Sequence, residues 1–257
     1  MTLTIYNIDD KLHNDWYTKF KYIFMAPIAI LRFSCLIAAY TFTFMLKIFP
    51  NWYNNYILRN ITIYLFLFSF GMYVTEIKNK NFIKNGIKNN AVTIYNHIAF
   101  TDAIVILLLY PFAIVVKSGY SKILEHILDA GDGIIIEKKP NQTQKIIDHV
   151  NAKRRCLIIA PEGTVTNGKY LAPFKLGAFA PLHPVQPILI RYIYKYYNPF
   201  FSEDPPYLTL YRMLTQFVNF VMIEVLPLEY PRFNESPAEF AERVRTIMAD
   251  ALNVQKV

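Results

Sequence analysis

The sequence predicts an α/β protein in which a mostly parallel central sheet is covered by helices and preceded by an N-terminal two-helix membrane hairpin. Two observations predict this fold. From Ala91 onward, short apolar, β-branched segments alternate with amphipathic ones, as they do where helices connect parallel strands. Before that point, apolar residues gather in two stretches with very few charges. We therefore expect residues 1–88 to form a membrane-associated hairpin with a basic linker, and residues 89–257 to form the α/β domain.

The first apolar stretch, Ile23–Leu46, has Arg32 as its only charge. As a helix it is long enough to cross the ~30 Å hydrocarbon core of a bilayer. The second stretch, Ile61–Val74, has no charge but is too short to cross comfortably. We expect a hairpin that enters one leaflet and returns; two full spans, or two buried helices of a soluble domain, are the alternatives.

Lysines flank this pair of stretches on both sides. Because basic residues tend to stay on the cytoplasmic side of a membrane, their positions place both ends of the hairpin, and the domain that follows, in the cytosol. The flanking residues are Lys11, Lys19 and Lys21 before the pair, and Lys78, Lys80, Lys84 and Lys88 after it.

The elements of the second region follow from its alternating pattern. The segments predicted as strands are Ala91–Tyr95, Ala113–Lys117, Gly133–Glu137, Cys156–Ala160, Val185–Ile190 and Phe220–Leu226. The segments predicted as helices are Asp102–Leu109, Ser121–Leu128, Gln142–Lys153 and Pro237–Leu252. The last helix has the clearest start, because Ser236 suits the N-cap and Glu239 the capping-box position. In such sheets, active residues gather at the carboxyl ends of the strands.

The composition narrows the classes of partner. Hydrophobic residues make up 54% of the 257 residues and charged residues 18%, which excludes a disordered chain. The net charge of +8 suits phosphates and acidic lipid headgroups. Nucleic acid is the other class that fits a basic chain, but the basic residues are spread out beside apolar blocks, so we expect no nucleic-acid partner. The two cysteines, Cys35 and Cys156, do not indicate a disulfide framework.

The first candidate site directly follows the strand Ala91–Tyr95. Here Asn96 and His97 are followed by Asp102, five residues after the histidine. A carboxylate can hold the proton on one imidazole nitrogen, which leaves the other nitrogen free to take a proton from a hydroxyl. This would be the base half of a catalytic triad, acting directly on a substrate alcohol. Taken alone, the pattern is also that of a helix N-cap beside an incidental histidine.

The second candidate site follows the strand Cys156–Ala160. Glu162, Gly163 and Thr164 place a carboxylate, a glycine and a hydroxyl group immediately after that strand. The glycine lets the main chain approach a ligand closely, and the polar groups beside it can bind a glycerol hydroxyl or a phosphate. The alternative is an ordinary turn from a strand into a loop.

Together, the two blocks resemble the signature of the glycerophospholipid acyltransferase superfamily, N-H-x-x-x-x-D followed by P-E-G-T. Segment Gly133–Lys138 is similar to a third block of that family, with lysine where arginine is usual. The likeness to the lysophosphatidylcholine acyltransferase branch is closer and runs from about Lys21 to the C-terminus. It is carried by segments Glu162–Gly168, Pro173–Phe179, Pro184–Tyr192, Leu214–Phe217, Glu224–Pro227 and Val244–Ala249.

The resemblance implies that His97 deprotonates the free hydroxyl of a lysophospholipid as that hydroxyl attacks the thioester of acyl-CoA, and that Asp102 orients His97. Acyl-CoA is then a co-substrate, and we expect neither a metal nor another cofactor. Membrane lipids are the expected surroundings, on the cytosolic face of the endoplasmic reticulum, and no protein partner is predicted. The residues expected to bind the substrates are Asn96, Glu162, Gly163, Thr164, Lys117, Lys138 and Lys175.

Two departures from the family pattern bear on the acceptor. Val165 stands where phosphatidic-acid-forming relatives usually have an arginine, which favours a lysophosphatidylcholine-like acceptor and leaves lysophosphatidate as the alternative. Lys138 keeps a positive charge but lacks the bidentate fork of arginine. A different class of function also stays open, a non-catalytic scaffold of lipid droplets or the endoplasmic reticulum with the same fold. The intact Asn96, His97 and Asp102 favour the enzyme.

Overall fold

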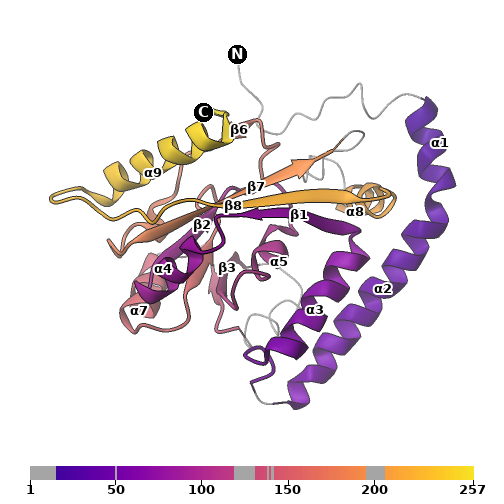
Figure 1. Cartoon of the computed structure of the whole chain (residues 1–257), viewed down its shortest axis with the longest axis horizontal. Helices are drawn as coiled ribbons and strands as arrows, with labels where there is room; N and C mark the ends of the chain where they lie inside the picture. The colour runs from indigo at the N-terminus through magenta and orange to yellow at the C-terminus, as the bar shows by residue number, and fades with distance from the viewer. Residues whose placement is uncertain (1–15, 50, 119–130, 138, 140–141, 195–205) are drawn as a thin grey trace.

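The computed structural model describes residues 16–49, 51–118, 131–137, 139, 142–194 and 206–257. In that part of the chain, seven strands form one sheet in the order β1-β8-β7-β2-β5-β3-β4 (Figure 1). All neighbouring strands of this sheet run parallel except β7 and β8, which confirms the predicted mostly parallel α/β fold. The strands are β1 Met72–Lys78, β2 Val92–Tyr95, β3 Ala113–Lys117, β4 Ile134–Ile136, β5 Leu157–Ile159, β7 Val185–Ile193 and β8 Asn219–Val225.

Two further strands pair only with each other, and helices fill the remaining segments. The small sheet consists of β6 Tyr170–Leu171 and β9 Gln255–Lys256. The helices are α1 Trp16–Phe24, α2 Ala26–Met45, α3 Tyr56–Ser69, α4 Phe82–Lys88, α5 Asp102–Ile106, α7 Gln142–Asn151, α8 Pro206–Leu214 and α9 Pro237–Leu252. Helix α9 begins with the predicted capping box between Ser236 and Glu239. The helix predicted over Ser121–Leu128 lies outside the described residues.

Residues 72–88 differ from the expected end of the hairpin and basic linker, because they form strand β1 and helix α4. Gly71 has a φ of +61°, a left-handed conformation that ends α3 two residues after Ser69. The chain then runs parallel to β8 from Met72 onward. The lysines at 78, 80, 84 and 88 therefore lie at the end of the sheet away from α2 and α3 (Figure 1).

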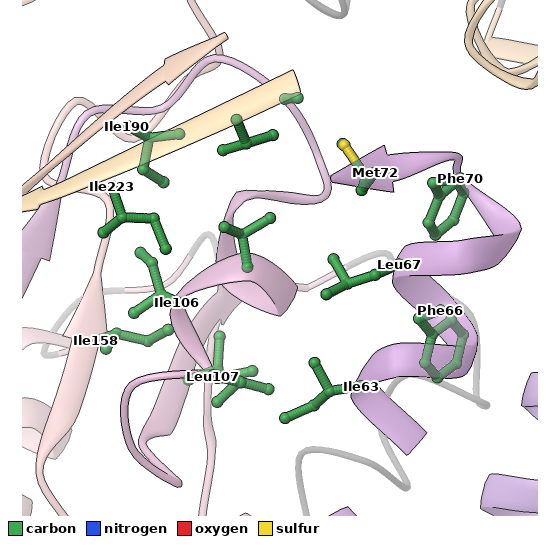
Figure 2. Close-up of a cluster of buried hydrophobic side chains, with 14 of the residues drawn as sticks. Ile63, Phe66, Leu67, Phe70, Met72, Ile106, Leu107, Ile158, Ile190 and Ile223 are labelled. Atoms are coloured by element: carbon green, nitrogen blue, oxygen red, sulfur yellow. The ribbon is translucent and has the colours of Figure 1, made fainter. Parts of the chain in front are cut away.

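Helices cover both faces of the seven-stranded sheet. On one face, Ile63 and Leu67 of α3 point toward the turn after α5 and toward the sheet, as Figure 2 shows, while the Phe66 ring packs edge to face on Tyr40 of α2. The sheet side of this cluster includes Ile158, Ile190 and Ile223, all fully buried. On the other face, α7 and α9 pack against a second cluster that contains Phe179, Phe240 and Val244. This is the layered arrangement expected of a parallel sheet.

Helices α2 and α3 pack against each other, as the predicted hairpin requires (Figure 1). Helix α2 is 20 residues long and apolar enough to cross a membrane. Only 22% of its most apolar 18-residue segment is buried. Helix α3 has 14 residues and packs one face into the core. The two helices nevertheless expose large hydrophobic side chains, among them Ile30, Phe33, Ile37 and Phe44 on α2 and Ile57, Ile61, Tyr64 and Phe68 on α3. We call this set the exposed apolar face of the hairpin.

The one charge of α2, Arg32, fastens the hairpin to the α/β layers. Its guanidinium is buried and donates to the main-chain carbonyls of Leu214 at 2.9 Å and Phe217 at 2.7 Å, and also to that of Gln216. These carbonyls belong to the segment between α8 and β8. Gly71 lies directly beneath, because a Cβ atom there would come within 2.4 Å of the guanidinium. Hydrogen bonds from a charged donor are stronger than neutral ones, so this contact fixes α2 against the domain.

We expect the substitution Arg32→Leu to lower the thermal unfolding midpoint of the detergent-solubilised protein. A hydrogen bond to a charged group contributes about 1.5–3 kcal/mol, so a net loss near 3 kcal/mol is reasonable once the leucine packs. For a chain of this size that corresponds to a fall of about 6–12 °C. The matched control is Ser34→Ala on the same helix, whose exposed hydroxyl bonds only to Ile30 of its own helix. Equal midpoints for the two variants would contradict the role of Arg32.

Candidate active site

The predicted acid–base pair of His97 and Asp102 is formed. His97 lies just past the carboxyl end of β2, and Asp102 is the first residue of α5. The Nδ1 atom of His97 is 3.0 Å from Oδ2 of Asp102. Because an ionised carboxylate only accepts hydrogen bonds, Nδ1 carries the proton and Nε2 keeps its lone pair. The His97 side chain is 19% exposed whereas that of Asp102 is fully buried. The imidazole therefore lies between the buried carboxylate and the protein surface.

The Asp102 carboxylate is held by the turn in which it lies. Its Oδ2 atom accepts the main-chain N–H of Ile98 at 2.7 Å and that of Ala99 at 2.9 Å, in addition to the His97 ring. The Asp102 N–H in turn donates to the Ala99 carbonyl, which closes the turn. A buried carboxylate is costly unless donors surround it, and here the main chain supplies two of them.

A further partner of Asp102 comes from β7, 90 residues away, and sequence reasoning missed it. The hydroxyl of Tyr192 donates to Oδ1 of Asp102 at 2.5 Å and lies 3.2 Å from Oγ1 of Thr101. Burial, and then the charge of Asp102, raise the pKa of Tyr192 well above its usual range, so the hydroxyl keeps its proton. One signal was present: Ile188, Ile190 and Tyr192 share a sheet face by their spacing, and Tyr192 ends that row at the carboxyl end of the strand.

Glu162 joins the two sequence blocks. It is buried, and its Oε1 atom accepts the main-chain N–H of His97 at 2.8 Å while Oε2 accepts that of Ala172 at 2.9 Å. The main chain of Thr166 returns to the same place and donates its N–H to the His97 carbonyl at 2.8 Å. Burial raises the pKa of Glu162 to about 7, although the His97 and Ala172 amides act in the opposite direction. Glu162 and Thr166 together therefore hold the main chain of His97, the first at its N–H and the second at its carbonyl.

The side chain of Asn96 also forms its hydrogen bonds with the main chain. Its Nδ2 atom donates to the Ile190 carbonyl at 3.0 Å, and its Oδ1 atom accepts the Ile190 N–H at 2.8 Å. The amide thus continues the ladder between β2 and β7 beyond Tyr95, where β2 ends. With its side chain buried and both polar atoms bonded to Ile190, Asn96 lies next to the His97–Asp102 turn rather than at an open surface.

Two of the three predicted lysines meet at Gly163. This glycine has a φ of +64°, and Lys117 at the end of β3 donates to its carbonyl. The side chain of Lys175 lies against the same residue, since a Cβ atom on Gly163 would come within 2.7 Å of its Cε and Nζ atoms. Thr164 is partly exposed in this loop. Lys138 lies outside the described residues, so the structure does not place the third lysine.

No cluster of three or more histidine, cysteine or carboxylate side chains that could hold a metal ion occurs among residues whose placement is described. The residues that the structure gathers are instead a histidine–carboxylate pair, its buried hydrogen-bond partners, and two lysines on the loop of the second block. They lie where β2, β3, β5 and β7 end, as expected for a parallel sheet.

Comparisons with known proteins match this part of the chain. The family model described as acyltransferase matches residues 74–191, a range that contains His97, Asp102, Glu162 and Lys175. Lysophospholipid acyltransferase LPEAT2 of Arabidopsis thaliana is 28% identical over 173 residues, which are 63% of this chain and 32% of that protein. The lysophosphatidylcholine acyltransferase of Drosophila melanogaster is 34% identical over 171 residues, 62% of this chain and 32% of that protein.

Human lysophosphatidylcholine acyltransferase 1 is 43% identical over 108 residues, 40% of this chain and 20% of that protein. The chain thus spans between a fifth and a third of the length of these relatives. Among solved structures, the crystal structure of the 1-acyl-sn-glycerophosphate acyltransferase PlsC from Thermotoga maritima superposes with a TM-score of 0.57. It covers 86% of this chain and 96% of that one, and at 15% identity it supports the fold alone. On these matches, residues 74–191 resemble the acyltransferase family, and the chain is similar to lysophospholipid acyltransferases over part of its length.

Proposed function

We propose that the protein transfers an acyl chain from acyl-CoA to the free hydroxyl of a lysophospholipid. The observation that carries the proposal is the pairing of a partly exposed His97 with a fully buried, fully hydrogen-bonded Asp102. This arrangement suits a general base that acts on a hydroxyl from outside the protein. The names of the matched relatives, which are lysophospholipid and lysophosphatidylcholine acyltransferases, support the substrate class.

In this reaction the Nε2 atom of His97 takes the proton of the acceptor hydroxyl as its oxygen attacks the thioester carbonyl. The C–O bond forms, the tetrahedral intermediate collapses, and the C–S bond breaks to release CoA as a thiolate. The proton on His97 then passes to that thiolate, which returns the ring to its neutral state. Asp102 stabilises the intervening imidazolium, and transfer is direct because no side-chain nucleophile takes part.

Three main-chain N–H groups at the start of the His97 turn are already occupied and do not serve as oxyanion donors in this mechanism. The N–H of His97 already donates to Glu162, and those of Ile98 and Ala99 donate to Asp102. In the second block, the N–H of Gly163 donates to the Ala160 carbonyl. We therefore assign the stabilisation of the tetrahedral oxyanion to other donors, in the later part of the His97–Asp102 turn or in the loop of the second block.

Glu162 and Asn96 take positioning roles in the proposal, since their polar atoms bond to the protein's own main chain. Contacts with the phosphate of the acceptor or of CoA are assigned to Lys117 and Lys175, which approach each other at Gly163. Lysines bind a phosphate as point charges and lack the bidentate fork of arginine. Val165 stands where phosphatidic-acid-forming relatives usually have that arginine, which favours a lysophosphatidylcholine-like acceptor over lysophosphatidate.

The proposal places the active site at the surface of a membrane. Phe100, inside the catalytic turn, packs edge to face on Phe70 at the C-terminal end of α3, with ring centroids 5.2 Å apart. The turn is therefore adjacent to the hairpin, whose exposed apolar face is of the kind that lies in lipid. Both substrates carry acyl chains and reside in a leaflet, so the hairpin would bring their polar heads to the depth of His97. We propose the cytosolic face of the endoplasmic reticulum as the membrane.

A non-catalytic scaffold with the same fold is the competing function. It predicts binding to lipid surfaces without turnover, so the first prediction below separates the two. The completeness of the hydrogen bonding around Asp102 favours the enzyme, because a scaffold has no use for a buried carboxylate aligned on a partly exposed imidazole.

We expect His97→Ala to reduce acyl transfer by about 10²–10⁴-fold, the usual contribution of a general base. The measurement is the release of CoA thiol by detergent-solubilised protein given acyl-CoA and lysophosphatidylcholine. His183→Ala is the matched control, because His183 precedes β7 at the opposite end of the parallel sheet and should leave the rate unchanged. Wild-type protein without thiol release, or a His97→Ala variant with substantial transfer, would refute the catalytic assignment.

A panel of acceptors tests the headgroup assignment. With one acyl-CoA and equal acceptor concentrations, we expect lysophosphatidylcholine or lysophosphatidylethanolamine to give a higher kcat/KM than lysophosphatidate. We also expect Val165→Arg to raise kcat/KM for lysophosphatidate relative to the others, because a guanidinium can bind a phosphate monoester in bidentate fashion. A wild-type preference for lysophosphatidate would instead assign the protein to phosphatidic acid synthesis.

Glu162 should give the stability of the protein a specific pH dependence. Its pKa rises from an ordinary value of 4.5 to about 7 on folding, so the folded state holds this proton more tightly than the unfolded state. The stabilisation is complete below pH 4.5 and is lost as the pH rises through 7. We expect the thermal midpoint of the wild type to fall between pH 5 and pH 8 by more than that of Glu162→Gln, which cannot titrate. Parallel curves for the two proteins would show that Glu162 does not titrate in this range.

A further inference from the structure

We propose that Tyr192 is a positioning residue for the acyl transfer reaction: its hydroxyl fixes the orientation and the charge distribution of the Asp102 carboxylate, and through it the basicity of His97. The inference rests on the proposed function for its kinetic consequence. Its structural basis is independent of the substrate, because it lies in the buried contact between β7 and the His97–Asp102 turn.

The two oxygens of Asp102 have unequal surroundings. Oδ2 accepts three N–H groups, those of the His97 ring, Ile98 and Ala99. Oδ1 accepts the Tyr192 hydroxyl at 2.5 Å, the shortest of the four contacts. A carboxylate with donors on one oxygen alone could twist about its Cβ–Cγ bond and move that oxygen out of line with the imidazole. A strong donor on Oδ1 opposes that rotation and keeps Oδ2 on the imidazole.

Tyr192 is itself held firmly. Its ring is buried in β7, and β7 is paired on one side with β2 and on the other with β8. Two residues earlier, Ile190 exchanges two hydrogen bonds with the side chain of Asn96, which immediately precedes His97. The strand that carries the hydroxyl is thus bonded directly to the segment that carries the imidazole. The Thr101 hydroxyl, 3.2 Å from that of Tyr192, completes the surroundings of the tyrosine oxygen.

The hydroxyl also draws negative charge toward Oδ1. When this donor is removed, more of the charge rests on Oδ2, and the carboxylate stabilises the protonated His97 ring more strongly. A base that acts through neutral imidazole then loses activity at a higher pH as the solution is acidified. At the same time the carboxylate can turn away from the ring, so the fraction of molecules with a correctly oriented base declines. Tyr192 is buried behind Asp102, so neither effect changes substrate binding.

The test compares Tyr192→Phe with Tyr53→Phe. Tyr53 is an equally buried tyrosine whose hydroxyl donates at 2.7 Å to the Phe112 carbonyl, at the amino end of β3 and hence at the opposite end of the sheet. Each variant removes one buried hydroxyl, with its single hydrogen bond in Tyr53→Phe and with its bonds to Asp102 and Thr101 in Tyr192→Phe, so both should lower the thermal midpoint. For Tyr192→Phe alone we expect kcat to fall about 10- to 100-fold, the loss of a hydrogen bond to a charged group, with KM unchanged for acyl-CoA and for lysophosphatidylcholine.

Two readouts separate positioning from general destabilisation. In kcat/KM against pH, we expect the acid limb of Tyr192→Phe to move to higher pH than in the wild type and in Tyr53→Phe. By NMR of isotope-labelled histidine in detergent micelles, without substrate, we expect the His97 resonance, assigned with His97→Ala, to titrate at a correspondingly higher pH. An unchanged His97 titration in Tyr192→Phe would overturn the proposal. Because the NMR measurement needs no turnover, an inactive wild type would reject the proposed function while still testing the role of Tyr192.

Discussion

The structure of the site depends on one buried charge, the carboxylate of Asp102. A charged group that is fully removed from water is stable only where donors surround it, and here four donors come from three places in the chain. The turn after β2 supplies two amides, His97 supplies its ring, and β7 supplies Tyr192. Asn96 bonds to Ile190 of β7, and Glu162 bonds to the main chain of His97, so both side chains help to hold the donors in position around Asp102. The sheet order, with β2 between β7 and β5, makes this convergence possible.

The hairpin and the site are connected through the same face of the sheet. Helix α3 fills the core on that face and meets the catalytic turn through Phe70 and Phe100. Helix α2 lies outside it and is fastened by Arg32 to the segment before β8. An apolar hairpin that was only tethered could leave the domain at any distance from a bilayer. This hairpin is held at two points, by the packing of Phe70 on Phe100 and by the hydrogen bonds of Arg32. These contacts fix the distance between the exposed apolar face and the imidazole.

Local features of the site were predictable, and features that depend on strand order were not. The pairing of His97 with Asp102 follows from their separation within one turn, and the capped helix α9 follows from Ser236 and Glu239. The role of Tyr192 needs the knowledge that β7 lies beside β2, which a hydrophobic pattern does not contain. Likewise β1 was hidden because Gly71 ends a helix inside a continuous apolar run, and the strand then ends at a lysine that resembles a linker. Asn96 and Glu162 were recognised as motif residues, but their partners are main-chain atoms that the motif does not reveal.

The bonds that join Asn96 to Ile190 and Asp102 to Tyr192 span 94 and 90 residues of chain. Contacts of such sequence separation form late, because a long loop must close before they are made. A growing polypeptide that has emerged only as far as Thr164 contains both signature blocks but lacks the strand that aligns them. On the proposed function, His97 is aligned as a base only after β7 has inserted beside β2, so an incomplete chain does not promote the attack of a hydroxyl on cellular thioesters.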